Sequence, residues 1–228
     1  MQEIKLKREE LPYEINEELK LLRTNILFCG TDKKVILVTS AFSGEGKSTV
    51  VFNLCKSLTE LGKSVILLDT DMRKSVLKGR IVKKPPKLGL SHFLSGQCKF
   101  ADILCKTNIP NFSVIFSGAI PPNPSELLST NNMKKIVAYC ADHYDYVIVD
   151  CPPVGLVVDA AVVAPICDGS IILIEAGEVK YRIAQEVVEK MRATGCPILG
   201  VVLNKVDYRG GNGYGYGSYY GKKYKSYY

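Results

Sequence analysis

The stretch VILVTSAFSGEGKST (residues 35–49) decides the fold. Its first four residues are β-branched or apolar and predict a short buried strand. Residues 43–46 form a turn with two glycines, and Lys47 and Ser48 then lead into apolar residues at helical spacing, up to a stop at Gly62. A glycine turn between a strand and a helix, closed by Lys-Ser, is typical of a phosphate-binding loop. We therefore expect a nucleotide site here, and not a ligand-free turn.

We call residues 41–49 the phosphate loop. Glycines let backbone N–H groups converge on phosphate oxygens, and the helix N-terminus adds a favourable dipole. We expect Lys47 to reach the β- and γ-phosphates and the Ser48 hydroxyl to bind Mg²⁺. The usual first glycine of such a loop is replaced by Ala41. The residues expected to bind the nucleotide are Ser43, Gly44, Glu45, Gly46, Lys47, Ser48 and Thr49.

Two acidic residues stand at the end of the next apolar run, a strand predicted over residues 64–69. Ligands of parallel sheets bind beyond the carboxyl ends of the strands, so Asp69 and Asp71 should face the phosphate loop. Two carboxylates two residues apart on an extended segment point the same way, which suits Mg²⁺ coordination and proton abstraction. A helix cap would explain one aspartate, but not both with Arg73 behind them. We assign Arg73 to the nucleotide site as well.

A third carboxylate, Asp150, closes the apolar run 144–150 and is followed by Cys151 and two prolines. An aspartate that ends a buried strand downstream of a phosphate loop is typical of the metal side of a nucleotide site. Asn204 follows the last predicted strand, over residues 198–203. Hydrogen bonding to a nucleotide base and capping explain Asn204 equally well.

Strand-like runs and helical periodicities alternate along the chain. Helices are expected over residues 11–28, 159–164 and 179–193, short ones around Ser91 and Phe100, and one from an N-cap at Ser125 to residue 143. Further strands are expected over residues 112–116 and 170–175. This alternation predicts an α/β fold with a mostly parallel sheet covered by helices on both faces. Together with the phosphate loop, the expected fold is P-loop NTPase-like. We expect one domain over residues 1–207.

The net charge of +7 is distributed unevenly. Seven basic residues and no acid lie between Met72 and Lys87, and four more follow Asp207 without an acid. Such stretches are either solvated loops or sites for anionic partners, and charge alone does not choose. The eight cysteines form no Cys-x-x-Cys pair and are expected to be reduced. No apolar run has membrane-spanning length and the N-terminus is charged, so a cytoplasmic protein is expected.

Residues 208–228 contain eight of the chain's 13 tyrosines, six glycines and no aliphatic residue. This composition cannot bury a core, so we expect the segment to be disordered. Tethered to an ATP site, it would be a phosphate acceptor at high local concentration. It could equally self-associate or stack on nucleic-acid bases. Composition leaves the two interpretations open.

Several motifs together are more specific than the phosphate loop. They are SAFSGEGKST (40–49), VILLDTDMRK (65–74), GLSHFLSG (89–96), IPPNPSELL (120–128), YDYVIVDCPPV (144–154) and the tyrosine cluster. In these motifs the chain resembles the bacterial tyrosine kinases of capsule and exopolysaccharide operons, and among them the cytoplasmic type found in Gram-positive bacteria. The resemblance extends from about Tyr13 to the last residue.

This resemblance implies phosphorylation of protein tyrosine with ATP and Mg²⁺, and with it regulation of polysaccharide synthesis and export. It implies that Asp69 is the base for the tyrosine hydroxyl and that Asp71 and Asp150 hold Mg²⁺ together with Ser48, directly or through water. The implied catalytic set is Lys47, Asp69, Asp71 and Asp150. The implied phosphate acceptors are Tyr208, Tyr214, Tyr216, Tyr219, Tyr220, Tyr224, Tyr227 and Tyr228.

The family has a Glu-x-x-Arg-x-x-Arg helix at the subunit interface of a ring-shaped homo-oligomer, for which an octamer is one candidate size. One subunit's tail enters its neighbour's site. Here the pattern is Glu17, Lys20 and Arg23 on the helix expected over residues 13–29, and lysine lacks the bidentate fork of arginine. The implied partners are a membrane-spanning polysaccharide co-polymerase, which activates the kinase and recruits it to the inner face of the membrane, and a cognate tyrosine phosphatase. Nucleic acid is not expected as a partner.

The main alternative is a related partition or division-site ATPase without kinase activity. Such proteins carry a signature lysine near the start of the loop, where this chain has Phe42. They often end in an amphipathic membrane helix, whereas this chain ends in tyrosines. Phe42 and the tyrosine-rich end both favour the kinase over this ATPase. A third alternative, a binding module with an idle nucleotide site, would require the whole carboxylate set to be accidental.

Overall fold

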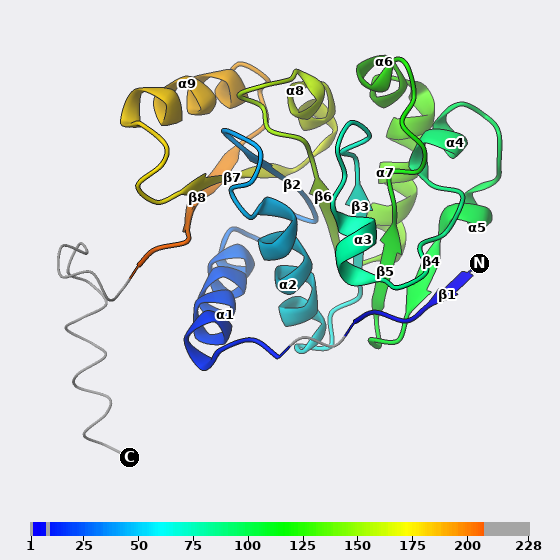
Figure 1. Cartoon of the computed structure of the whole chain (residues 1–228), viewed down its shortest axis with the longest axis horizontal. Coiled ribbons are helices and arrows are strands. Elements are labelled where there is room, and N and C mark those ends of the chain that lie inside the picture. Colours follow the sequence, from blue (N-terminus) through cyan, green and yellow to red (C-terminus); the bar gives the residue numbers. More distant parts are fainter. Residues whose placement is uncertain (1, 8–9, 208–228) are drawn as a thin grey trace.

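The computed structural model describes residues 2–7 and 10–207, and eight strands of this part form a single sheet (Figure 1). The strands are β1 (Gln2–Ile4), β2 (Val35–Ser40), β3 (Val65–Asp69), β4 (Cys105–Thr107), β5 (Phe112–Ile115), β6 (Tyr146–Asp150), β7 (Gly169–Glu175) and β8 (Ile198–Asn204). They lie in the order β1-β4-β5-β3-β6-β2-β7-β8, and among them only the β4–β5 pair is antiparallel. The predicted mostly parallel sheet is confirmed.

Helices connect the strands. They are α1 (Tyr13–Phe28), α2 (Lys47–Thr59), α3 (Leu77–Ile81), α4 (Leu90–Leu94), α5 (Phe100–Ile103), α6 (Pro124–Leu128), α7 (Asn131–His143), α8 (Asp159–Val163), a 3-10 helix (Ala164–Ile166) and α9 (Tyr181–Arg192). The short helices expected around Ser91 and Phe100 are present as α4 and α5. The prediction missed β1, β4 and α3, because three to five residues are too few for a periodicity to be recognised.

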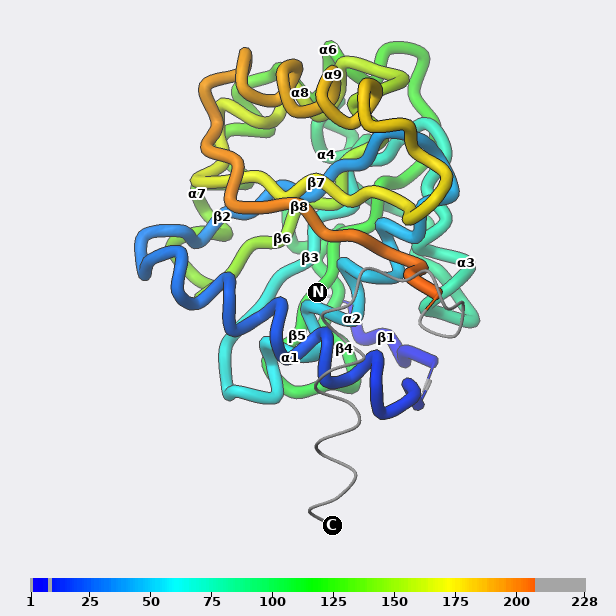
Figure 2. The backbone as a smooth tube through the Cα atoms, turned by 90° about the vertical axis from the view of Figure 1, so that its left-hand side faces the viewer, coloured from blue at the N-terminus to red at the C-terminus, as the bar shows by residue number. Residues whose placement is uncertain are grey.

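The central strands β2, β3 and β6 are buried on both faces, which explains why they are apolar almost throughout. In β3, Val65 and Leu67 belong to the core beneath α1, α2 and α3, whereas Ile66 and Leu68 belong to the core beneath α4 to α9. The same alternation in β2 separates Ile36 from Leu37. Figure 2 shows the two helical layers on either side of the sheet, with β8 at its edge. This arrangement is the one expected for a parallel sheet.

The helix predicted from Ser125 to residue 143 is wrong. Two helices, α6 and α7, occupy this region, with N-caps at Asn123 and Thr130. The hydroxyls of Ser129 and Thr130 donate to the carbonyls of Glu126 and Leu127, at 2.7 Å each, and so satisfy acceptors at the end of α6. Local bonds of this kind compete with helix continuation. Ser125 lies inside α6 and uses its hydroxyl elsewhere.

Within the described residues, no helix combines the length and the apolar character that a membrane crossing requires.

Gly89, which precedes α4, offers a test of packing. A Cβ atom there would lie within 2.5 Å of the Phe116 carbonyl oxygen and of backbone atoms of Gly118, which cannot move aside as a side chain can. We expect Gly89→Ala to lower the free energy of unfolding by about 1–3 kcal/mol. The matched control is Gly79→Ala, inside α3, where a Cβ would have no atom within 4 Å. The control should raise stability by roughly 0.5–1 kcal/mol, since alanine favours helix. Urea unfolding measures both, and equal midpoints would contradict this packing.

Candidate functional site

The phosphate loop joins β2 to α2 at the carboxyl edge of the sheet. Gly44 and Gly46 have φ angles of 92° and 90°, a conformation that side chains other than glycine rarely adopt. Gly46 is the N-cap of α2, so the helix begins at Lys47 with Ser48 and Thr49 in its first turn. Ser43 and Gly44 are exposed. The loop therefore has the backbone geometry that directs N–H groups toward an anion.

Contacts from inside the loop and from β8 hold its conformation. The buried Glu45 side chain accepts a 2.9 Å hydrogen bond from the Ala41 N–H group. Asn204, at the end of β8, donates from its amide to the Glu45 carbonyl at 2.7 Å. Lys205 donates to the Gly44 carbonyl at 2.9 Å and pairs with Glu175. Asn204 thus supports the backbone of the phosphate loop directly. This contact is neither of the two roles considered from sequence, a hydrogen bond to the base and a cap.

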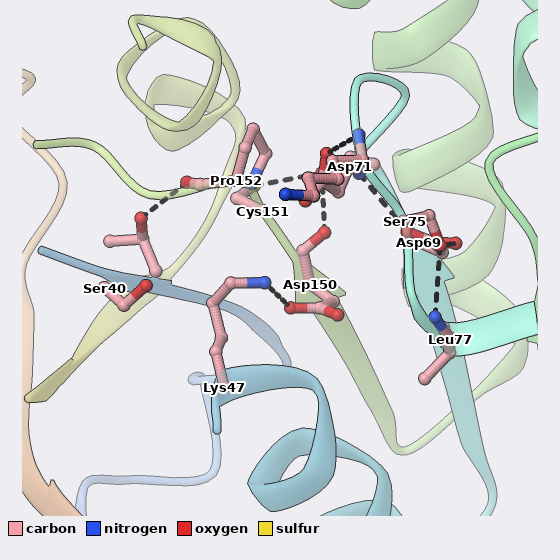
Figure 3. A network of polar contacts seen from close by, with 12 residues as sticks. Ser40, Lys47, Asp69, Asp71, Ser75, Leu77, Asp150, Cys151 and Pro152 are labelled. Atoms are coloured by element: carbon pink, nitrogen blue, oxygen red, sulfur yellow. Dashed lines mark hydrogen bonds and ion pairs between the residues drawn. The ribbon is translucent and has the colours of Figure 1, made fainter. Parts of the chain in front are cut away.

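Lys47 and Asp150 form an ion pair in the centre of the site (Figure 3). The lysine side chain is 8% exposed and the aspartate 1%. Burial alone would lower the pKa of Lys47, but the Asp150 carboxylate outweighs this effect and raises it. The lysine therefore stays charged. A lysine paired this deeply needs a counter-charge at all times, because a lone buried charge is strongly unfavourable.

The second oxygen of Asp150 fits the predicted Mg²⁺ site. Asp150 Oδ1 contacts Lys47, whereas Asp150 Oδ2 is buried without a hydrogen-bond partner. Such orphaned acceptors are rare in folded proteins and point to an ion or water. Among the described residues, no three His, Cys, Asp or Glu side chains converge on a common metal position. Mg²⁺ takes one or two carboxylates and completes its shell with phosphate and water, and Asp150 Oδ2 can supply one such ligand.

Asp69 lies beside Asp150, on the side away from Lys47. The two aspartates are paired across β3 and β6, and β6 separates β3 from β2. Asp69 is fully buried, and its Oδ2 accepts hydrogen bonds from the Ser75 hydroxyl at 2.5 Å and from the Ser117 N–H group at 3.2 Å. Burial, with repulsion from Asp150, raises the pKa of Asp69 to about 7. A carboxyl group in this state can exchange a proton near neutral pH.

Asp71 lies two residues beyond the end of β3, immediately before the turn at residues 72–74. Its Oδ1 accepts hydrogen bonds from the N–H groups of Arg73, at 3.2 Å, and Lys74, at 2.9 Å. The Asp71 carboxylate is near enough to contribute to the raised pKa of Lys47. Figure 3 shows Asp71 beyond the strand end, above Asp150. The structure thus brings Lys47, Asp69, Asp71 and Asp150 to one edge of the sheet.

The structure does not bring Arg73 to the phosphate loop. Its guanidinium group forms two hydrogen bonds with the buried Asp159, at 2.8 Å and 2.9 Å, and a third at 2.9 Å with the hydroxyl of Ser125. Asp159 lies on α8 and Ser125 on α6. In the described structure Arg73 therefore makes structural contacts with two helices, which the sequence did not predict.

The three residues of the predicted interface pattern do not form one free surface on α1. Lys20 and Glu17 form an exposed ion pair at 2.7 Å. Arg23 turns toward α2 and donates to the Ser57 carbonyl at 2.6 Å and to Glu60 at 3.1 Å. Only 13% of the Arg23 side chain is exposed. The eight predicted phosphate acceptors, and with them the tail predicted to be disordered, lie outside the described residues.

Several residues at the site were not identified from sequence: Ser75 and Ser117, which bind Asp69, Asp159 and Ser125, which bind Arg73, and Lys205, which binds the phosphate loop. One signal was available. Asp159 is the only charged residue of the stretch 154–167, and an isolated acid in an apolar stretch indicates a buried charge with a partner.

The sequence of this chain matches a protein-family model and several known proteins. A family model described as an AAA domain matches residues 33–193. The tyrosine-protein kinase CpsD of Streptococcus agalactiae is 40% identical over 191 residues, which cover 84% of this chain and 83% of that protein.

Solved structures give the same grouping. The kinase domain of the Escherichia coli tyrosine kinase ETK superposes with a TM-score of 0.81 at 28% identity, over 92% of this chain and 86% of that one. The cell division ATPase MinD of Pyrococcus furiosus reaches a TM-score of 0.63 at 25% identity, over 75% and 71%. The similarity is greater to the kinase domain than to the division ATPase. The shared P-loop fold implies that this chain binds a nucleotide.

The raised pKa of Asp69 predicts how stability depends on pH. Between its usual value of 3.8 and about 7, Asp69 is protonated in the folded chain and ionised in the unfolded chain. The folded state then binds more protons, so the free energy of unfolding falls as pH rises through this range. In Asp69→Asn, which cannot ionise, we expect a shallower fall. Urea unfolding in EDTA between pH 4.5 and 8 measures it.

The control for this experiment is Asp168→Asn. Asp168 accepts hydrogen bonds from the N–H groups of Lys34 and Val35, at the opposite edge of the sheet. This variant should keep the wild-type slope. Identical slopes for wild type and Asp69→Asn would contradict the prediction.

Proposed function

The chain belongs to the bacterial tyrosine kinases, and from this premise we propose that it phosphorylates the tyrosines of its own C-terminal segment in trans and thereby regulates capsular or exopolysaccharide synthesis and export. The observation that carries the proposal is the buried Lys47–Asp150 pair, with an unpartnered Asp150 oxygen and the proton-accepting Asp69 beside it. A phosphate cradle, a metal-side carboxylate and a base are the parts that phosphoryl transfer to a hydroxyl requires.

In this mechanism the chain contributes position and charge. The N–H groups of residues 43–49 bind the phosphates, and Lys47 moves its ammonium group from Asp150 toward the γ-phosphate as the nucleotide enters. Mg²⁺, held by Ser48, Asp71 and Asp150, directly or through water, would offset charge on the phosphate oxygens. Asp69 accepts the proton of the attacking tyrosine hydroxyl, and its raised pKa suits that exchange near neutral pH. Ser75 and Ser117 orient the Asp69 carboxylate for this step.

We also propose the assembly and partners that membership in this family implies. Glu17, Lys20 and Arg23 lie on a helix that would contact the next subunit of a ring, with the contact made mainly by Glu17 and Lys20 because Arg23 is held by α2. The tail of one subunit would reach the site of its neighbour. A membrane-spanning activator would recruit the kinase to the membrane, and a tyrosine phosphatase would reverse the modification.

Mass spectrometry after incubation with Mg-ATP tests tail phosphorylation. A full-length Lys47→Met chain serves as acceptor and a wild-type chain truncated after Asp207 as donor. Alone, the acceptor lacks the catalytic lysine and the donor lacks the tail, so neither should carry phosphotyrosine in residues 208–228. When the two are mixed, phosphotyrosine should be found within residues 208–228 of the acceptor. Lys47→Met alone should lose activity by about 100-fold or more, because it lacks the charge that balances the transferring group. No phosphotyrosine, even with the activator's cytoplasmic segment added to wild type, would favour the division-site ATPase instead.

Phosphorylation should also change the assembly. Each phosphate adds about −1.5 to −2 charges at pH 7, so a basic tail becomes acidic and leaves the neighbouring site. We expect the ring to dissociate after incubation with Mg-ATP. Light scattering measures the mass before and after, and a chain with all eight tail tyrosines changed to phenylalanine should keep its mass. An unchanged mass of the phosphorylated wild type would rule this step out.

A further inference from the structure

Arg73 joins three loops that leave the carboxyl ends of neighbouring strands. Its own loop follows β3, α6 follows β5, and α8 follows β6. The guanidinium group contacts both carboxylate oxygens of Asp159, at 2.8 Å and 2.9 Å, and the Ser125 hydroxyl at 2.9 Å. Ser125 in turn donates to Asp159 at 2.6 Å. The three side chains form a closed triangle, in which each contacts the other two.

The triangle is built around a charge that burial makes costly. The Asp159 side chain is 0% exposed, whereas that of Arg73 is 39% exposed. Burial would raise the pKa of Asp159, but the hydrogen bonds from Arg73 and Ser125 outweigh it and lower the pKa, so the carboxylate stays ionised. A bidentate arginine–carboxylate pair fixes orientation as well as distance. The position of Arg73 is therefore set by α8 and α6, which belong to distant parts of the sequence.

The same residue holds the carboxylate of Asp71. The Arg73 N–H group donates to Asp71 Oδ1 at 3.2 Å, next to the 2.9 Å bond from Lys74. The start of this loop is also fixed, because the N–H group and the hydroxyl of Thr70 both donate to the Asp150 carbonyl at 2.9 Å. Residues 70–74 are thus anchored at both ends, to β6 by Thr70 and to α6 and α8 by Arg73. Asp71 lies between the two anchors.

We propose that Asp159 and Ser125 are positioning residues, which act through Arg73 to fix the Asp71 carboxylate relative to Asp150. They need not touch nucleotide or metal themselves. The inference depends on the proposed function in one respect, that Asp71 and Asp150 hold Mg²⁺ together. Because Mg²⁺ demands near-ideal octahedral geometry, a small shift of one carboxylate weakens its binding. Residues that orient metal ligands typically change metal affinity by about 10- to 100-fold when they are removed.

The first arm of the test needs neither nucleotide nor metal. Amide hydrogen exchange of the metal-free chain is compared in wild type, Asp159→Asn and Arg73→Lys, which keeps the charge but loses the fork. Both variants should accelerate exchange of the Arg73 and Lys74 amides, which donate to Asp71, by about tenfold or more. Exchange at the Val35 amide, on the opposite edge, should stay within about twofold. Asp168→Asn, the matched control, should accelerate exchange at Val35 and not at Arg73 or Lys74.

The second arm measures ADP affinity at increasing Mg²⁺ concentration. Asp159→Asn and Arg73→Lys should raise the Mg²⁺ concentration that gives half of the affinity gain by about tenfold. ADP affinity in EDTA should stay within about twofold, because the phosphate loop is untouched. A smaller shift in the same direction is expected for Ser125→Ala, which removes two of the triangle's contacts but leaves the ion pair. Asp168→Asn should bind Mg²⁺ and ADP as wild type does.

The outcomes separate the two proposals. If Mg²⁺ does not affect ADP affinity in wild type, the metal role in the proposed function is wrong, and exchange at Arg73 and Lys74 alone decides the positioning role. Unchanged exchange at these amides in both variants would overturn the inference, and so would an equal loss of ADP affinity with and without Mg²⁺. If Asp159→Asn fails to fold, Arg73→Lys, with its charge retained, carries the same two measurements.

Discussion

The buried ion pair between Lys47 and Asp150 constrains the rest of the structure. It joins the first residue of α2 to the last residue of β6, so the phosphate loop cannot shift from the central strand without leaving a charge uncompensated. Because β6 lies between β2 and β3, Asp150 lies between Lys47 on one side and Asp69 on the other. The carboxyl ends of parallel strands all lie at the same edge of the sheet. At this edge the ion pair joins the segment after β2 to the end of β6. The site therefore arises from strand order as much as from local motifs.

Around this pair the site is supported from both sides. Asn204, the last residue of β8, and Lys205, which follows it, bind carbonyls of the phosphate loop. On the other side Arg73, bound to Asp159 and Ser125, holds the loop that carries Asp71. Both supports use side chains that approach from loops following other strands. Functional groups held in this way keep their geometry when no ligand is present, which reduces the reorganisation that binding would otherwise require. The chain thus concentrates many polar contacts in a small region.

Sequence patterns predicted the sheet, the helical layers and the carboxyl-edge residues, because apolar runs and strand ends are local features. They did not predict contacts between distant segments. The motif around Arg73 suggested a nucleotide ligand, and nothing within that motif indicates the partner Asp159, which lies 86 positions away. The break between α6 and α7 was missed for the opposite reason, since Ser129 and Thr130 end the helix through bonds that periodicity does not register. Short edge strands such as β1 depend on their neighbours for their existence.

The contact between Lys205 and Gly44 has a geometric consequence for the C-terminal segment. Asp207, two residues later, is the last described residue, so the described chain ends close to the phosphate loop. The 21 residues that follow could span at most about 75 Å when fully extended. That contour length exceeds the width of a small domain, so the segment has enough chain to reach an adjacent molecule. Lys205 links this end of the described chain to the loop backbone, so the position from which the C-terminal segment departs is coupled to the position of the Gly44 carbonyl.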